Sequence, residues 1–166
     1  MKTTAFFTRI LSWLTGSRLT VDNSVVRELN LDRFLGSWYE VARFDHFFER
    51  GMSQTKANYV LRDDGNIDVI NTGIKNGKPK TAKGKAKRTD VPALFRVSFF
   101  GPFYSDYRVM LVDADYRYML IGSGSDGYLW ILSRTPQLAD SDRTAILSEA
   151  KSRGYDIDKL IWVKQD

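Results

Sequence analysis

The sequence predicts an all-β protein: an eight-stranded antiparallel up-and-down barrel with one C-terminal α-helix packed outside it and a leader at the N-terminus. Three observations predict this fold. Eight short runs of strand-forming residues follow one another from residue 38 to residue 133 at nearly regular spacing. Tight hairpin signals separate several of them. One helical segment comes after the eighth run, and no internal repeat calls for another architecture.

Length and composition indicate one globular domain. The chain has 166 residues, of which 43% are hydrophobic, 27% charged and 13% aromatic, enough to bury a substantial core. The absence of cysteine excludes disulfides, thiolate chemistry and cysteine-rich zinc sites. His46 is the one histidine, so we expect no metal and no cofactor. A net charge of +5 favours anionic surroundings but does not by itself indicate nucleic acid.

Residues 1–27 form a leader, and residues 28–166 form the barrel domain. Within residues 1–15, apolar side chains recur at three- and four-residue spacing; they are Phe6, Phe7, Ile10, Leu11, Trp13 and Leu14. Three interpretations stay open: an amphipathic helix on a membrane surface or on the domain, a secretion signal interrupted by Arg9, and a loosely ordered leader. No apolar run approaches the roughly 20 residues of a membrane-spanning helix.

The first strand and the residues before it organise the predicted barrel. Phe34 and Leu35 form an apolar half-turn, Gly36 breaks it, and Trp38–Phe44 is the strand. Glycine lets a large neighbour lie across the backbone without a Cβ in the way. Trp38 is therefore a candidate plug for one end of the barrel, although a strand start with one core tryptophan is equally compatible with this stretch.

Glu40 has the same strand parity as Trp38, so its side chain is expected inside the barrel. A lone buried carboxylate is costly. We therefore predict that Glu40 pairs with a buried donor, with Arg134 or a tyrosine as candidates. A local twist that turns Glu40 to solvent is the alternative.

Two tight turns join the second, third and fourth strands. The second strand, residues 55–61, is followed by Asp64-Gly65, and the third, residues 67–71, is followed by Asn76-Gly77. Both dipeptides suit hairpin turns that need positive φ.

The fourth strand, Thr81–Lys87, is the most informative. Its two faces consist of Lys83, Lys85 and Lys87 towards solvent, and Ala82, Gly84 and Ala86 towards the interior. Protein interiors are densely filled, so an inner face almost without side chains means either close approach of another element or space left open. In an antiparallel all-β chain, the second option points to a ligand cavity.

The remaining elements complete the barrel. Strands are predicted at residues 94–100, 107–112, 116–121 and 128–133, with turns at 101–102, 113–115 and 124–127. A helix capped by Asp140 or Ser141 and ended by Gly154 follows, and the last apolar run, residues 160–163, is a closing strand. Eight strands leave a bore just wide enough for side chains or one small ligand.

Three separated motifs resemble the signature regions of the lipocalins. They are Gly36-Ser37-Trp38-Tyr39 on the first strand, Asp113-Ala114-Asp115-Tyr116 after the sixth, and Arg134 at the end of the eighth. Longer matches, including residues 38–51 and 128–136, look like the group of bacterial lipocalins and apolipoprotein D. The resemblance spans roughly residues 28 to 164.

The resemblance implies a protein that binds and transports or stores a small hydrophobic ligand, a fatty acid or lysophospholipid, inside the barrel. It also implies that Trp38 closes one end with Arg134 laid across it, so that the motif residues Gly36, Trp38, Asp115, Tyr116 and Arg134 are structural. The resemblance implies a pocket wall that includes Tyr59, Asn71, Phe99 and Trp130. Strand alternation places Phe95 and Val97 with Phe99, and Ala82, Gly84 and Ala86 on the inner face of the fourth strand. Tyr107 completes the predicted ligand-binding set. For each of these residues, core packing is the alternative.

One departure from the group concerns localisation. Its bacterial members are typically outer-membrane lipoproteins tethered through a cysteine near the start, and this chain has no cysteine. The resemblance favours the periplasm or cell envelope, with a soluble or peripherally membrane-associated protein and membrane contact through residues 1–15. The sequence leaves monomer and homodimer open.

Two other classes of function fit the sequence less well. Residues 122–127 match the dinucleotide fingerprint G-x-G-x-x-G, but a strand rather than a helix follows, so we interpret the match as a hairpin turn and predict no enzyme. The run Lys75–Arg88 holds seven basic residues and no acid, which makes nucleic-acid or anionic-surface binding the alternative function. It lacks interleaved aromatic residues, so we expect no nucleic-acid partner.

Overall fold

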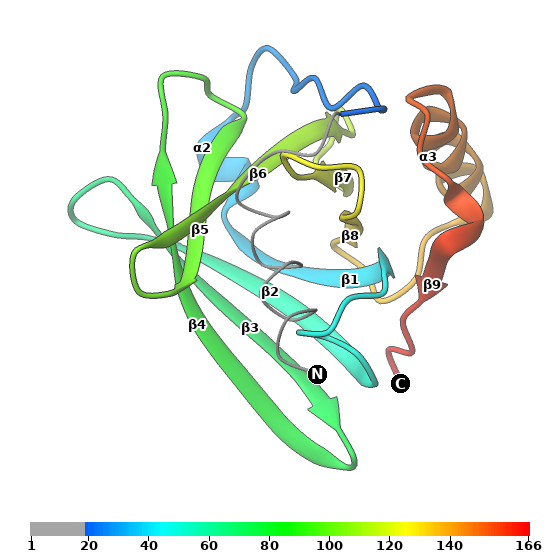
Figure 1. The fold of residues 1–166 in the computed structure, drawn as a ribbon, viewed down its shortest axis with the longest axis horizontal. Coiled ribbons are helices and arrows are strands. Elements are labelled where there is room, and N and C mark those ends of the chain that lie inside the picture. Colours follow the sequence, from blue (N-terminus) through cyan, green and yellow to red (C-terminus); the bar gives the residue numbers. More distant parts are fainter. Residues whose placement is uncertain (1–18) are drawn as a thin grey trace, which may run out of the picture.

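The computed structural model describes residues 19–166 and shows a closed antiparallel β-barrel (Figure 1). Its strands are β1 (Gly36–Phe44), β2 (Met52–Leu61), β3 (Ile67–Lys75), β4 (Lys78–Arg88), β5 (Leu94–Phe100), β6 (Phe103–Val112), β7 (Tyr118–Gly122) and β8 (Leu129–Ser133). Each strand pairs with the next, β8 returns to β1, and the β1–β2 pairing completes the ring. The predicted up-and-down barrel is confirmed. The expected amphipathic or signal-like segment, residues 1–15, lies outside the described residues.

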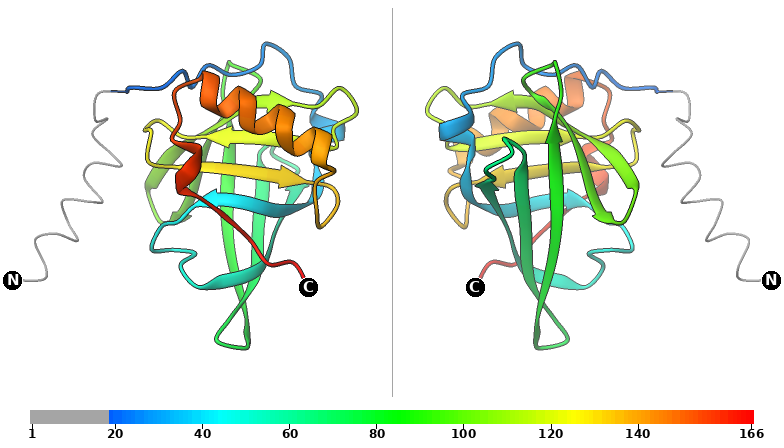
Figure 2. Two further views of the ribbon diagram at one scale, coloured as in Figure 1. Left: turned by 90° about the vertical axis from the view of Figure 1, so that its right-hand side faces the viewer. Right: turned by 90° about the vertical axis from the view of Figure 1, so that its left-hand side faces the viewer.

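Four further elements complete the fold: α2 (Leu31–Phe34), α3 (Asp140–Ser152), the 3₁₀ turn η1 (Ile157–Lys159) and β9 (Leu160–Trp162). Helix α3 lies outside the barrel, across β7 and β8 (Figure 2). It buries Ile146 and Ala150 against outward-facing side chains of the strands, such as Leu120 and Ile131. Strand β9 pairs with β1, whereas β1 and β2 make the closure of the barrel.

The turns follow the predicted chemistry, but the helix start does not. Asn76 and Gly77 have φ of 51° and 72°, as a tight hairpin turn requires. Gly154, with φ of 95°, ends α3 as predicted. The predicted cap by Asp140 or Ser141 is wrong, because the N-cap is Ala139, which makes no side-chain cap hydrogen bond. Asp140 lies in the first turn, where its charge complements the helix dipole.

The three motifs meet at the closed end of the barrel. Trp38 is fully buried, and its indole N–H donates to the carbonyl of Phe34 at 2.8 Å. The guanidinium of Arg134 lies 3.6 Å from the indole ring centre and donates to the carbonyls of Ser37 and Leu35 at 2.8 and 2.9 Å. Gly36 has φ of 93°, and a Cβ there would lie 3.4 Å from the Arg134 guanidinium.

The second motif, Asp113–Tyr116, forms a turn that contacts the α2 segment. Tyr116 has φ of 55°, and its hydroxyl accepts a hydrogen bond of 2.7 Å from the backbone N–H of Asn30. The guanidinium of Arg33 lies 4.7 Å from the Tyr116 ring centre. The backbone N–H of Asp115 donates to the carboxylate of Asp113 at 3.1 Å, which fixes the turn. This end of the barrel is therefore sealed by the segment that carries α2.

Residues 19–27, which belong to the expected leader, run along the outside of the barrel. Val21 is buried, and the backbone N–H of Asp22 donates to the carbonyl of Arg153 at 2.8 Å. The backbone N–H of Val26 donates to the carbonyl of Val109 at 3.0 Å. Across residues 19–166, the helices are all too short or too polar to cross a bilayer.

Candidate ligand-binding site

The bore is filled with side chains at its closed end. The ring of Phe34 stacks on the rings of Tyr59 and Phe95, with centre distances of 4.8 and 5.3 Å. The hydroxyls of Tyr59 and Tyr107 lie 2.7 Å apart in a hydrogen bond. Burial raises the pKa of both phenols, so each is neutral in the folded protein. Four of the predicted ligand-binding residues belong to this packed cluster: Tyr59, Ala86, Phe95 and Val97. Three more, Phe99, Tyr107 and Trp130, are partly buried and pack against it.

Towards the open end, the inner face is incompletely covered. The β3–β4 register places Asn71 opposite Ala82 and Val69 opposite Gly84, so all four share the inner face. Val69 is buried, whereas Asn71 is half-buried and Ala82 is exposed. Trp130, across from Arg43 on the neighbouring strand, is also half-buried. At this level of the bore, these inward-facing groups therefore stay partly accessible to solvent.

The surroundings of Gly84 differ from the predicted open space beside the inner face of β4. A Cβ at this position would lie 2.7 Å from the ring of Phe99 and 2.6 Å from the carbonyl oxygen of Ser98. Gly84 therefore permits close approach of Phe99, which was the other option that the small inner face allowed. The open wall expected along the whole strand is therefore wrong at Gly84 and at the buried Ala86, and Ala82 is exposed.

A buried ion pair lies on the inner wall near the open end. Glu40 is 7% exposed, as its parity predicted, but the predicted partner is wrong: its carboxylate accepts from Arg43 at 3.0 Å, not from Arg134 or a tyrosine. A β-bulge between Glu40 and Ala42 shifts the alternation of β1, so that Arg43 follows Glu40 into the interior. Arg134 is occupied at the opposite end.

Arg43 also fastens the β1–β2 loop, residues 45–51, to the barrel wall. Its guanidinium donates to the carbonyl of Glu49 at 2.8 Å and to that of Met52 at 3.3 Å. The Glu49 carboxylate lies 3.4 Å from the guanidinium Nε. Two glutamates thus share one buried arginine, and desolvation followed by the charge of Glu49 raises the pKa of Glu40 well above its ordinary range.

This pKa shift predicts a stability that depends on pH. Because the folded protein holds the Glu40 proton more tightly than the unfolded chain does, the contribution of Glu40 is fully present below its ordinary pKa of 4.5. It is lost as pH rises through the raised folded pKa. Urea unfolding between acid and neutral pH is expected to show this decline, and Glu40→Gln is expected to flatten it. The control Glu28→Gln, an exposed surface change, should keep the wild-type slope; equal slopes in wild type and Glu40→Gln would contradict the assignment.

His46 lies in an aromatic cluster beside this ion pair. Its ring is 5.5 to 5.8 Å from the rings of Phe48, Tyr128 and Trp130. Desolvation lowers the pKa of His46, so the imidazole is neutral at neutral pH. Within residues 19–166, neither ring nitrogen has a hydrogen-bond partner, and the Glu49 carboxylate is 3.6 Å away. Strand alternation gives no sign of the inward-facing Arg43, because the bulge that turns it inward is visible only in the structure.

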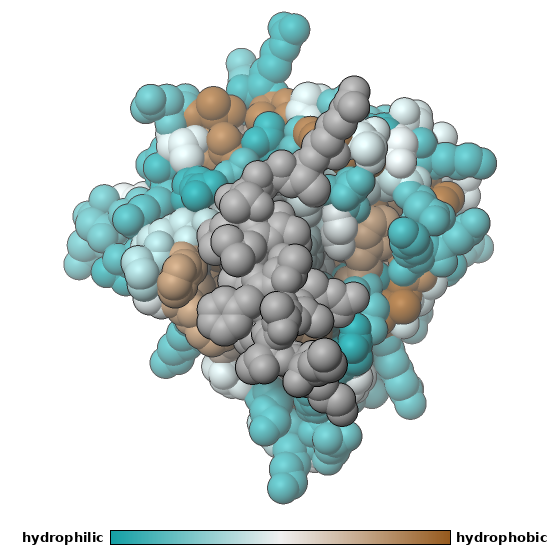
Figure 3. Space-filling model, viewed as in Figure 1, coloured by the Kyte–Doolittle hydropathy of each residue, from teal (hydrophilic) through white to brown (hydrophobic). Residues whose placement is uncertain are grey.

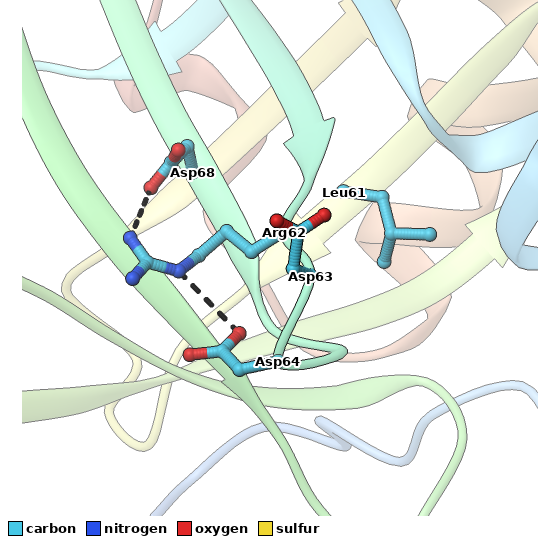
Figure 4. Close-up of a pocket in the computed structure, with 5 residues that line it drawn as sticks. All are labelled: Leu61, Arg62, Asp63, Asp64 and Asp68. Carbon is cyan, nitrogen blue, oxygen red and sulfur yellow. Dashed lines mark hydrogen bonds and ion pairs between the residues drawn. The ribbon is translucent and has the colours of Figure 1, made fainter.

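Other features of residues 19–166 do not extend the site. A surface hollow of about 480 Å³ lies at the β2–β3 turn, at the closed end, where Arg62 pairs with Asp68 at 2.8 Å and with Asp64 at 3.4 Å (Figure 4). Within this described range, no cluster of three or more histidine or acidic residues is placed to hold a metal. Residues 122–127 comprise the last residue of β7 and the turn that leads into β8, with no helix after it.

Comparisons with known proteins agree with this architecture. The family of lipocalin-like domains matches residues 29–165. Over 146 residues, the chain is 47% identical to the outer membrane lipoprotein Blc of Escherichia coli K12, covering 86% of this chain and 82% of that protein. Over 152 residues, it is 32% identical to apolipoprotein D of Mus musculus, covering 85% and 79%. The crystal structure of lobster apocrustacyanin A1 superposes with a TM-score of 0.71 at 20% identity, covering 91% and 89%, which shows a shared fold.

The resemblance drawn from the three sequence motifs is therefore confirmed over the whole barrel. The chain belongs to the lipocalins, a family of barrels that bind small hydrophobic ligands.

Proposed function

We propose that the barrel binds a single-chain amphiphile, a fatty acid or a lysophospholipid, for transport or storage. The acyl chain would lie in the bore and the polar head at the open end. The observation that carries the proposal is the contrast between the two levels of the interior: an apolar, packed floor beneath Tyr59 and Phe95, and inward-facing groups at Asn71, Ala82 and Trp130 that remain accessible.

The energetics of such binding need no special contact. Burial of an acyl chain contributes about 0.8 kcal/mol per methylene, so about ten methylenes correspond to micromolar affinity. In this arrangement, Phe99 and Trp130 contact the upper chain and the floor residues contact its end. Lys75, Lys78 and Lys80, on the β3–β4 hairpin at the open end, suit a carboxylate or phosphate head group.

Lipid extraction tests the proposal first. Mass spectrometry of an organic extract of the purified protein is expected to find a stoichiometric fatty acid or lysophospholipid. If the extract is empty, and titration with acyl ligands of several lengths also gives no binding, the proposal fails.

Tryptophan fluorescence tests the place of the ligand. Titration with an acyl ligand is expected to quench wild-type fluorescence, because Trp130 faces the accessible level of the bore. Trp130→Phe should lose most of the quenching while lipid still copurifies. The matched control is Trp162→Phe, because Trp162 lies on β9 outside the barrel. Quenching that survives in Trp130→Phe and disappears in Trp162→Phe would place the ligand elsewhere.

We further infer a cell-envelope location, because the relative from Escherichia coli is named an outer membrane lipoprotein. Fractionation of the producing cells tests this inference, which a purely cytosolic protein would contradict. The absence of enzyme activity and the alternative function of the basic run Lys75–Arg88 stay predictions. A salt-sensitive gel shift with DNA would favour that alternative.

A further inference from the structure

Four exposed phenylalanines gather at the open end of the barrel. Phe47 and Phe48 lie in the β1–β2 loop and are 42% and 39% exposed; Phe100 and Phe103 flank the β5–β6 turn and are 63% and 53% exposed. The ring centres of Phe47 and Phe48 are 3.9 Å apart, and those of Phe48 and Phe100 are 5.9 Å apart. We call these four residues the aromatic rim. Soluble proteins seldom expose such a cluster without a binding role.

A basic hairpin lies beside the aromatic rim. Lys75 pairs with Met52, the first residue of β2 after the β1–β2 loop, so the β3–β4 hairpin adjoins the loop of Phe47 and Phe48. This hairpin projects beyond the rest of the barrel (Figures 1 and 2), and its tip is hydrophilic (Figure 3). It carries Lys75, Lys78 and Lys80, and the sequence from residue 75 to residue 88 contains no acid.

We propose that the aromatic rim and these three lysines dock the open end of the barrel on a lipid bilayer with anionic head groups. Aromatic rings favour the head-group level of a bilayer, and lysines near the surface are attracted to anionic lipids. The phenylalanines stand on two separate loop tips, which a fluid bilayer accepts without shape complementarity. A second copy of the chain would need a complementary face. This proposal goes beyond ligand binding. In the docked orientation, the open end of the bore would face the membrane.

Vesicle flotation tests the contribution of the aromatic rim. The full chain is expected to float with vesicles of mixed phosphatidylglycerol and phosphatidylcholine. Phe100→Ser/Phe103→Ser should lower the partition coefficient by about tenfold or more. The matched control is Val60→Ser/Leu61→Ser, two residues that are 43% and 46% exposed at the closed end. Residues 1–18 are the same in both variants, so any vesicle binding through them contributes equally to the two measurements.

A second pair of variants tests the charge. Lys75→Gln/Lys78→Gln/Lys80→Gln should lower binding to the anionic vesicles by about tenfold or more and leave binding to pure phosphatidylcholine unchanged. The control Arg27→Gln/Arg88→Gln/Lys151→Gln removes the same charge from three exposed residues outside the hairpin tip and the rim. Equal losses in the two triple variants would assign the effect to overall charge and overturn the proposed orientation.

A unique label reports the orientation directly. Because the chain has no cysteine, Phe100→Cys or Leu61→Cys can carry one environment-sensitive fluorophore. The label at residue 100 should shift to the blue on vesicle addition, and the label at residue 61 should not. The proposal would be overturned if Phe100→Ser/Phe103→Ser floated with vesicles as well as wild type. It would also be overturned if this variant changed only the self-association of the protein. If lipid still copurifies with Phe100→Ser/Phe103→Ser, ligand binding in the barrel stands whatever the result for membrane docking.

Discussion

Arg43→Leu is expected to lower the free energy of unfolding at neutral pH by about 3–5 kcal/mol. The side chain of Arg43 is 1% exposed, and it is the cation that faces the carboxylates of both Glu40 and Glu49. Its removal leaves buried negative charge unpaired and the backbone carbonyls of Glu49 and Met52 without their donor. Urea unfolding followed by circular dichroism measures the loss, and acid should reduce it because protonation neutralises the carboxylates.

Two further variants separate buried charge from charge in general. Arg50→Leu removes an arginine of the same loop that pairs with Asp45 at 3.3 Å but is 63% exposed, so it should cost about 1 kcal/mol or less. The double variant Arg43→Leu/Glu40→Gln should recover part of the stability, since an uncharged side chain replaces the stranded carboxylate. If Arg43→Leu and Arg50→Leu cost the same, the buried pair does not hold the loop as described.

The same contacts connect stability to the open end of the barrel. The β1–β2 loop carries Phe47 and Phe48, and Arg43 holds that loop through the carbonyls of Glu49 and Met52. A buried cluster that holds a loop in place also sets where its exposed rings stand. Any loss of vesicle binding in Arg43→Leu should therefore be compared with Phe100→Ser/Phe103→Ser, which leaves the cluster intact.

The sequence was sufficient where local chemistry determines structure. Asn76-Gly77 predicted its hairpin because few other residues adopt positive φ at two successive positions. Parity predicted that Glu40 is buried. Strict alternation from Glu40 would place Arg43 outside, but a single bulge turns it inward, because one extra residue flips every later side chain of a strand. Strand parity therefore predicted the burial of Glu40 but not its partner, Arg43.

The inner wall shows a second limit. The pattern Ala82, Gly84, Ala86 fixed which face the small residues share, and the β3–β4 register agrees with it. Whether a small face adjoins space or a neighbour depends on side chains from other strands. Phe99 packs against Gly84, while Ala82 stays exposed. The local sequence pattern determines which way the side chains of a strand point. The packing of other strands determines how much space lies beside them.

Trp38→Ala is expected to lower the free energy of unfolding by about 3–5 kcal/mol. The indole is fully buried at the closed end, so its loss leaves a cavity beside Phe34 and removes the donor to the Phe34 carbonyl. The guanidinium of Arg134 also loses the ring 3.6 Å beneath it. Urea unfolding at neutral pH measures the effect.

Trp162 supplies the matched control because it repeats the same contact in a different place. The guanidinium of Arg143 lies 3.6 Å from the Trp162 ring centre, as Arg134 does over Trp38, but Trp162 is 39% exposed on β9. An exposed cation–π contact contributes about 0.5–1 kcal/mol, so Trp162→Ala should cost far less than Trp38→Ala. Equal losses would mean that the arginine contact, rather than burial of the indole, stabilises the closed end. A large difference would show that the barrel depends on an apolar plug, to which Arg134 adds a cover.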